Sequence, residues 1–174
     1  FTWSASMNLS HNTGKILTLE GDNSYHNGNG FVAPGTPGDA ARMEAGSTIG
    51  SFYMWKFAGF DDEGSFLLYN KDGEVIPAAQ KTENDKQYIG NYTPKLIIGW
   101  SHTLTYKNFD LGINLRSWID FDVYNTINMY YGIQGQGNLN VLKDAYGKFN
   151  HIKGEKQICD YFLEDGTFLK IDAI

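Results

Sequence analysis

The sequence predicts an all-β fold of antiparallel strands, arranged as part of a transmembrane β-barrel with long loops and one short loop helix. Aromatic residues make up 15% of the chain, and its 20 glycines against 4 prolines favour strands and turns over helices. The segments 95–106 and 109–120 alternate apolar and polar residues over about 11 or 12 positions each, and about 9 to 11 residues suffice to cross a bilayer. A water-soluble sheet with one solvated face would show the same alternation and stays open as the competing fold.

The two alternating segments are expected to form one long hairpin over 91–120. One face is mostly apolar and carries Leu96, Ile98, Trp100, His102, Leu104 and Tyr106 from the first arm and Phe109, Leu111, Ile113, Leu115 and Ile119 from the second. The other face carries hydroxyl, amide and charged side chains. This sidedness suits a wall with lipid on one side and water on the other.

The residues before this hairpin mix strands with loops. Residues 1–10 alternate without a break and predict a strand, and 15–19 are expected to resume β structure after a turn. The glycine- and proline-rich stretch 20–46 has no periodicity and predicts a long loop. Residues 47–59 predict a further strand, and the turn 70–73, Asn-Lys-Asp-Gly, lies between two short β runs as in a hairpin.

The residues after the hairpin predict the helix and a last strand. The helix is expected over 138–149, where Asn138 can cap the first turn, Leu139, Leu142 and Tyr146 share one face, and Gly147 can end it. Residues 166–174 predict the start of a strand.

Composition and charge exclude several classes of protein. The net charge of −6, without any basic cluster, argues against a nucleic-acid partner. No apolar run reaches the ~18 residues of a transmembrane helix, a test that does not detect barrel strands. The chain of 174 residues opens within an alternating run, so we expect it to be part of a longer protein. Cys159 is the one cysteine and is expected to be a buried small hydrophobic residue.

The chain is not expected to be an enzyme or to bind a cofactor or metal. Asp61, Asp62 and Glu63 are adjacent, so on an extended chain they point to opposite sides, unlike a positioned acid/base pair. The histidines lack metal-ligand spacing; they are His11, His26, His102 and His151. A piece of a glycoside hydrolase would need two carboxylates about 5 to 9.5 Å apart, and no such pair is evident. The stronger alternative is a soluble β-sandwich that binds carbohydrate.

Several spaced motifs resemble one family. The run 89–95, IGNYTPK, followed by 103–111, TLTYKNFDL, is similar to a segment in the C-terminal half of SusC/RagA-type TonB-dependent outer-membrane transporters. Three further motifs match in order, namely GSFY at 50–53, DVYN at 122–125 and EDGTFLKI at 164–171. The chain departs from the family at Tyr92, where proline is usual. It also departs at 83–86, which lacks the glycines of an acidic loop, so no ion site is carried over.

The resemblance implies that residues 1–174 are a partial barrel domain from a plugged, roughly 22-stranded TonB-dependent transporter. The plug domain and TonB box would precede the chain and the final strands would follow it, with long loops about 20–46, 60–93 and 125–163. Such a transporter imports glycans or oligopeptides across the outer membrane of a Gram-negative, Bacteroidetes-type bacterium. Its implied partners are a SusD-like surface lipoprotein, TonB, the lipid bilayer and the glycan or peptide substrate.

The barrel interpretation assigns roles to three groups of residues. Lumen-facing positions, either solvated or packed against the plug, are expected for Asp110, Asn114 and Arg116. Trp3, Trp100 and Tyr106 are expected in interfacial aromatic belts, whereas a soluble fold would place them in a core. Candidates for solute contact, or for packing in loops and against the lipoprotein, are Tyr124, Asn125, Tyr130 and Tyr131, because aromatic rings stack on sugars and amides bond hydroxyls.

Overall fold

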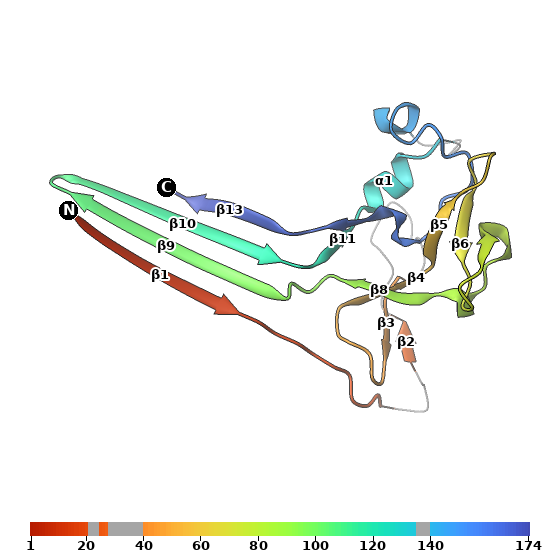
Figure 1. Ribbon diagram of the computed structural model, residues 1–174, viewed down its shortest axis with the longest axis horizontal. Helices are drawn as coiled ribbons and strands as arrows, with labels where there is room; N and C mark the ends of the chain where they lie inside the picture. The colour runs from red at the N-terminus through yellow and green to blue at the C-terminus, as the bar shows by residue number, and fades with distance from the viewer. Residues whose placement is uncertain (21–24, 28–39, 135–139) are drawn as a thin grey trace.

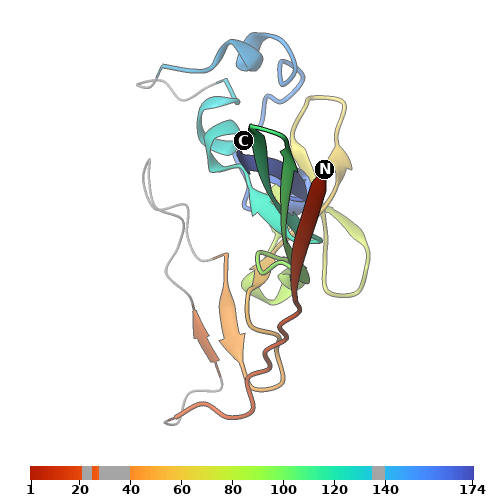
Figure 2. The ribbon, with the colours of Figure 1, turned by 90° about the vertical axis from the view of Figure 1, so that its left-hand side faces the viewer.

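A long four-stranded sheet projects from a compact body of loops and short strands (Figure 1). The structure is a computed structural model that describes residues 1–20, 25–27, 40–134 and 140–174. We call the sheet the blade; its strands lie in the order β1, β9, β10 and β13 and are all antiparallel. Their bounds are Thr2–Ser10, Leu96–Tyr106, Phe109–Ile119 and Phe168–Ala173. Viewed end-on, the four strands form one layer (Figure 2).

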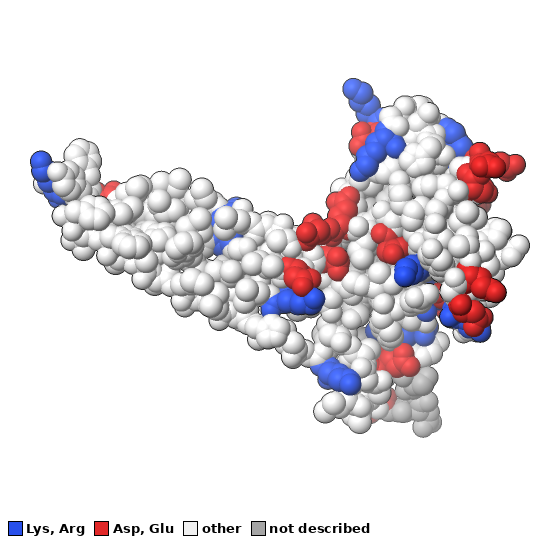
Figure 3. Space-filling view, in the orientation of Figure 1, with Lys and Arg blue, Asp and Glu red and all other residues white. Residues whose placement is uncertain are grey.

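The body, which we call the head, contains every other element. Its described residues form three strand pairs: β2 (Tyr25–Asn27) with β3 (Arg42–Glu44), β4 (Ser51–Met54) with β8 (Gln87–Asn91), and β11 (Asp122–Tyr124) with β12 (Leu163–Asp165). A three-stranded sheet contains β5 (Lys56–Phe60), β6 (Phe66–Tyr69) and β7 (Val75–Pro77). The helix α1 spans Thr126–Tyr131, and 3-10 turns lie at Ala78–Gln80, Glu83–Asp85, Lys143–Tyr146 and Asp160–Phe162. On the face seen in Figure 3, charged side chains gather over the head and the base of the blade.

The path of the chain places both long connections at one end of the blade. β1 runs into the head, β9 returns from it, a two-residue turn at Lys107–Asn108 reverses the chain, and β10 runs back into the head before β13 leaves it. Lys107 takes a φ of 54°, the left-handed conformation that such tight turns use. The described residues between β1 and β9, and those between β10 and β13, therefore lie at the head, and the short turn lies at the tip (Figure 1).

The blade confirms the predicted hairpin. Residues pair antiparallel from Tyr106 with Phe109 at the turn to Leu96 with Ile119 at the head. β1 adds on the free side of β9, and β13 adds on the free side of β10, with one register shift after Asn114. The barrel is not closed within this chain, since β1 and β13 are the edges of the four-stranded sheet.

The hydrophobic core lies in the head. It holds Phe52, Met54, Trp55, Phe66, Leu68, Met129, Ile133, Ile152, Cys159 and Phe162, among others, and no residue of the blade belongs to it among the described residues. Aromatic rings meet edge to face around Tyr161, which contacts Phe60 at 5.2 Å and Phe162 at 5.0 Å between centroids. Cys159 is fully buried, as predicted, and burial raises the pKa of its thiol to about 12.

One predicted element is wrong and two are realised only in part. The helix expected over 138–149 is a 3-10 turn at Lys143–Tyr146 in its described part, whereas Asn138 and Leu139 lie outside the described residues. The α-helix begins instead after Asn125, whose side chain accepts from the backbone N–H of Asn128. The expected strand 47–59 is extended from residue 51 onward, but it is divided at Trp55 between β4, which pairs with β8, and β5, which pairs with β6. Trp55 itself forms a bridge with Cys159. The expected β structure over 15–19 is one bridge, from Lys15 to Thr48.

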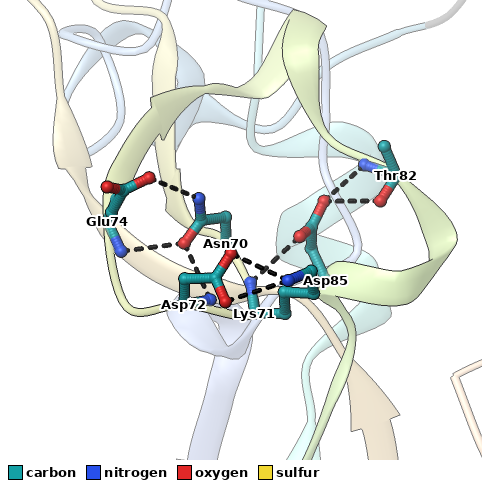
Figure 4. A network of polar contacts seen from close by, with 6 residues as sticks. All are labelled: Asn70, Lys71, Asp72, Glu74, Thr82 and Asp85. Carbon is teal, nitrogen blue, oxygen red and sulfur yellow. Dashed lines mark hydrogen bonds and ion pairs between the residues drawn. The ribbon is translucent and has the colours of Figure 1, made fainter.

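The predicted hairpin around the turn 70–73 is confirmed, and Asp85 ties it to the next loop (Figure 4). Asp85 is buried, and its carboxylate accepts from the backbone N–H of Lys71 at 2.9 Å and from both the N–H and the hydroxyl of Thr82 at 2.7 Å. These hydrogen bonds, the largest from the Thr82 side chain, hold the pKa of Asp85 below its ordinary value of 3.8.

Protonation of Asp85 is therefore expected to loosen this part of the head. Because the folded pKa lies below the unfolded one, the stabilisation is present above about pH 4 and is lost as pH falls through the folded pKa. Replacement of Asp85 by alanine should lower the free energy of local opening by about 1.5 to 3 kcal/mol at neutral pH. Hydrogen exchange of residues 70–86 in the full-length protein measures this, with the exposed Asp72→Ala as control. Equal effects of the two substitutions would contradict the conclusion that the Asp85 carboxylate holds the two loops together.

Candidate functional site

The blade gathers one apolar face from all four strands. In register across the sheet lie Trp3, Leu104 and Leu111 in one row and Met7, Trp100, Leu115 and Ile171 in another. Large apolar side chains on this face are exposed, with Met7 at 54% and Leu111 at 43%. A β-sandwich would bury such a face beneath a second sheet. Among the described residues no sheet covers it, and an apolar patch of this extent marks a surface that meets lipid or protein.

The opposite face of the blade is polar. Thr2, Ser4, Ser6 and Asn8 of β1 face Thr105, Thr103, Ser101 and Gly99 of β9, which in turn face Asp110, Gly112, Asn114 and Arg116 of β10. The three predicted lumen-facing residues thus share one face. Asp110 accepts from the hydroxyl of Thr105 at 2.6 Å, and Arg116 donates to Asp172 at 3.3 Å.

The three predicted belt residues lie on the apolar face. Tyr106 is paired with Phe109 next to the turn at the tip, and Trp3 lies one row nearer the head. Trp100 lies further toward the head and is paired with Met7 and Leu115. Two of the three therefore lie toward the tip of the blade, together with Phe109, and Trp100 lies midway.

An aromatic cluster at the base of the polar face was missed. Trp118 lies among the polar positions of β10, and its ring contacts Phe168 at 5.6 Å and Phe121 at 6.0 Å between centroids. The available signal was that Ser117 and Trp118 break the alternation of β10, which puts Ser117 on the apolar face and Trp118 on the polar face. One ring partner, Phe121, is three residues away, but the other, Phe168, comes from about 50 residues later in the chain. The cluster joins the blade to the head on its polar side.

The four candidates for solute contact are in the head, and the structure separates them by exposure. Tyr124 is 8% exposed and Tyr130 is 5% exposed, and both belong to the hydrophobic core. Burial raises the pKa of each phenol. Tyr131 packs against the core and is partly exposed. The Asn125 amide caps α1 and donates to Glu164 at 2.9 Å. Solute contact therefore stays a prediction, carried by Tyr131 and Asn125 in this conformation.

The remaining polar groups of the head serve turns and loops. A carboxylate oxygen of Asp61 accepts from the backbone N–H groups of Glu63 and Ser65, as in a tight turn. Beside it is an open cavity of about 320 Å³, whose lining includes Phe66 and the buried Gln157. Within the described residues, no cluster of His, Cys, Asp or Glu side chains is arranged to hold a metal ion. The described helices include none that could span a membrane.

Two curated proteins are similar in sequence over nearly the whole chain. The TonB-dependent receptor P3 of Formosa agariphila is 25% identical over 98% of this chain and 19% of its own length. The TonB-dependent receptor SusC of Bacteroides thetaiotaomicron is 24% identical over 100% of this chain and 18% of its own length. The chain thus spans about a fifth of the relatives that it matches. No model of a known protein family matches the chain.

A solved structure shares the fold. The structure of the RagAB peptide transporter superposes with a TM-score of 0.70 at 21% identity, over 97% of this chain and 20% of that one. The antiparallel blade and its head therefore have the fold of a barrel segment in that transporter.

Proposed function

We propose that the chain is a segment of a SusC/RagA-type TonB-dependent receptor and that the whole protein imports a nutrient through the outer membrane. In this proposal the blade contributes four strands to the transmembrane wall, and the missing neighbours of β1 and β13 come from the rest of the receptor. Closure is required because every backbone N–H and C=O at bilayer depth must be paired.

The observation that carries the proposal is the two-sided blade. Its apolar face extends over four strands and is not covered by any part of the chain that the structure describes, and its polar face carries hydroxyl, amide and charged groups. A transmembrane barrel needs this combination, with lipid outside and water or a plug inside. We therefore assign Asp110, Asn114 and Arg116 to the lumen and Trp3, Trp100 and Tyr106 to the lipid side.

The position of the loops gives the orientation. Transmembrane barrels have short periplasmic turns and longer extracellular loops. The head holds both long connections, so we place it outside the cell, and the turn at Lys107–Asn108 faces the periplasm. The head is then the part of this segment that first meets an incoming solute, and Tyr131 and Asn125 are its proposed contacts.

The proposed partners and substrate classes are those that the resemblance implies. We propose that a SusD-like surface lipoprotein works with the head and that TonB acts on a part of the receptor outside this chain. The solved structure that shares the fold is of a peptide transporter, and glycans are the other substrate class that the resemblance implies. Relatives of this chain are named receptors and transporters, which supports transport without bond chemistry. Localisation would be the outer membrane of a Bacteroidetes-type bacterium.

Labels on adjacent residues of β10 test the barrel wall. In the full-length receptor, freed of other reactive cysteines and placed in bilayers, a fluorophore on Leu111→Cys should be strongly quenched by lipids with brominated acyl chains. The same label on Gly112→Cys should be quenched little, because residue 112 points to the other face. The substitution at Gly112 fits, since a Cβ there would meet no atom within 4 Å.

The same two labels also report exposure to water and can contradict the proposal. A water-soluble quencher should reach the Gly112→Cys label if the lumen beside residue 112 is open to water. If the plug covers residue 112, the quencher should reach neither label. Equal quenching of both labels by brominated lipid, or quenching of neither, would mean that the blade is not a lipid-facing wall.

A further inference from the structure

His102 is a polar residue in the middle of the apolar face. It lies between Ala5 on β1 and Ile113 on β10, with Trp100 and Leu104 as the next residues on the same face of its own strand. Polar and ionisable side chains are costly at bilayer depth and usually mark a functional contact. The wall has no evident structural need for an imidazole here, because aliphatic residues occupy the equivalent positions on both neighbouring strands.

Two tryptophans flank the His102 ring. The indole Nε1–H of Trp3 donates to Nδ1 of His102 at 3.1 Å, and the two rings are stacked with centroids 5.9 Å apart. The Trp100 ring is also in contact with the imidazole, tilted by 51° with 4.6 Å between centroids. Since an indole N–H can only donate, Nδ1 carries a lone pair and the ring proton is on Nε2. The structure thus fixes which nitrogen is the donor.

The Nε2–H group has no hydrogen-bond partner among the described residues. A donor left unpaired in hydrocarbon is unfavourable, so its acceptor comes from outside the chain. His102 lies four residues from Tyr106 at the tip, roughly 10 Å along the membrane normal for a tilted strand. Aromatic residues gather at that end of the blade, as they do at the level of lipid headgroups and ester groups.

We propose that His102, Trp3 and Trp100 form a binding site for a glycerophospholipid of the periplasmic leaflet. The His102 Nε2–H donates to an ester carbonyl oxygen of the lipid, and the two indole rings pack along its acyl chain. The site rests on the proposed function, which places this face in the membrane and the tip of the blade toward the periplasm. It adds a specific lipid contact to a wall that otherwise meets acyl chains without selection.

A matched pair of lipids tests the hydrogen bond. The full-length receptor is reconstituted with equal amounts of diester and diether phosphatidylethanolamine that have identical chains, since only the diester has carbonyl oxygens. Lipids retained by the protein are then counted by native mass spectrometry. We expect the wild type to retain the diester lipid about 2- to 10-fold over the diether, the ratio that one hydrogen bond supplies. His102→Phe should abolish this preference, and His102→Gln, which keeps an N–H donor, should restore part of it.

The control is Ile113→Phe, a change of apolar size in the same row of the sheet, which should leave the preference intact. The lipid site alone would be overturned if the receptor inserts, as the Leu111→Cys variant reports, and the wild type shows no preference for the ester lipid. Failure to insert would overturn the proposed function itself. If His102→Phe changes the number of receptor copies in the complex without altering lipid retention, the acceptor belongs to a protein and the lipid site is wrong.

Discussion

We expect replacement of Leu115 by arginine to destabilise the folded barrel by about 1 to 4 kcal/mol, because the charge would enter the lipid-facing surface. Leu115 is paired with Trp100 on β9 and Ile171 on β13, so an apolar row surrounds it on both sides. The measurement is urea titration of the full-length receptor folded into lipid vesicles, with gel mobility of the folded barrel as the second readout.

The matched control is the adjacent Asn114→Arg. Residue 114 belongs to the polar face, which already carries Arg116 two positions further along the same strand. Its substitution should change the free energy of unfolding by no more than about 0.5 kcal/mol, as is usual at solvated positions. Similar losses for the two variants would show that the two faces of β10 do not meet different solvents.

Replacement of Phe66 by alanine should destabilise the head by about 3 to 5 kcal/mol, the usual cost of removing a buried phenylalanine ring. Phe66 is 1% exposed, and its ring contacts those of Phe60 at 4.9 Å, Phe57 at 5.9 Å and Phe162 at 6.3 Å between centroids. The loss should appear as faster hydrogen exchange in β5, β6 and β7. Protection of the blade should persist, because its backbone hydrogen bonds do not depend on this core.

The comparison variant for Phe66 is Tyr146→Ala, which removes an aromatic ring that is 70% exposed on the same head. It should leave exchange in β5 to β7 nearly unchanged. If exchange in the blade rises as much as exchange in the head, the two parts unfold as one unit and the separate core of the head is not what stabilises it.

The predicted solute contacts show what the local sequence can and cannot predict. Tyr124 and Tyr130 were selected because aromatic and amide residues are dense near 125–131, and the chain does form its α-helix there. Their rings, however, fill the core against residues from 149 to 162, a contact that no local pattern encodes. Density of aromatics therefore located the region but did not distinguish an exposed ring from a packed one.

The helix shows the same limit at the level of secondary structure. Asn125 caps a helix of six residues, too short to give a clear 3.6-residue period. The stretch 138–149 has such a period in part, but its described residues are held in another shape, with the backbone N–H of Leu142 donating to the carbonyl of Tyr131. Tertiary contacts decided between the two candidates.

The sequence by itself determined the blade hairpin, both of its faces and the strand that opens the chain. Alternation with period two is a local property, and a two-residue turn sets the register of the strands that it joins. Only the tertiary structure decided that β1 lies beside β9 and β13 beside β10, and that the loops enclose a core built around Trp55, Phe66 and Cys159. Those pairings join residues that are about 50 to 100 positions apart, and their free energy depends on which distant surfaces meet.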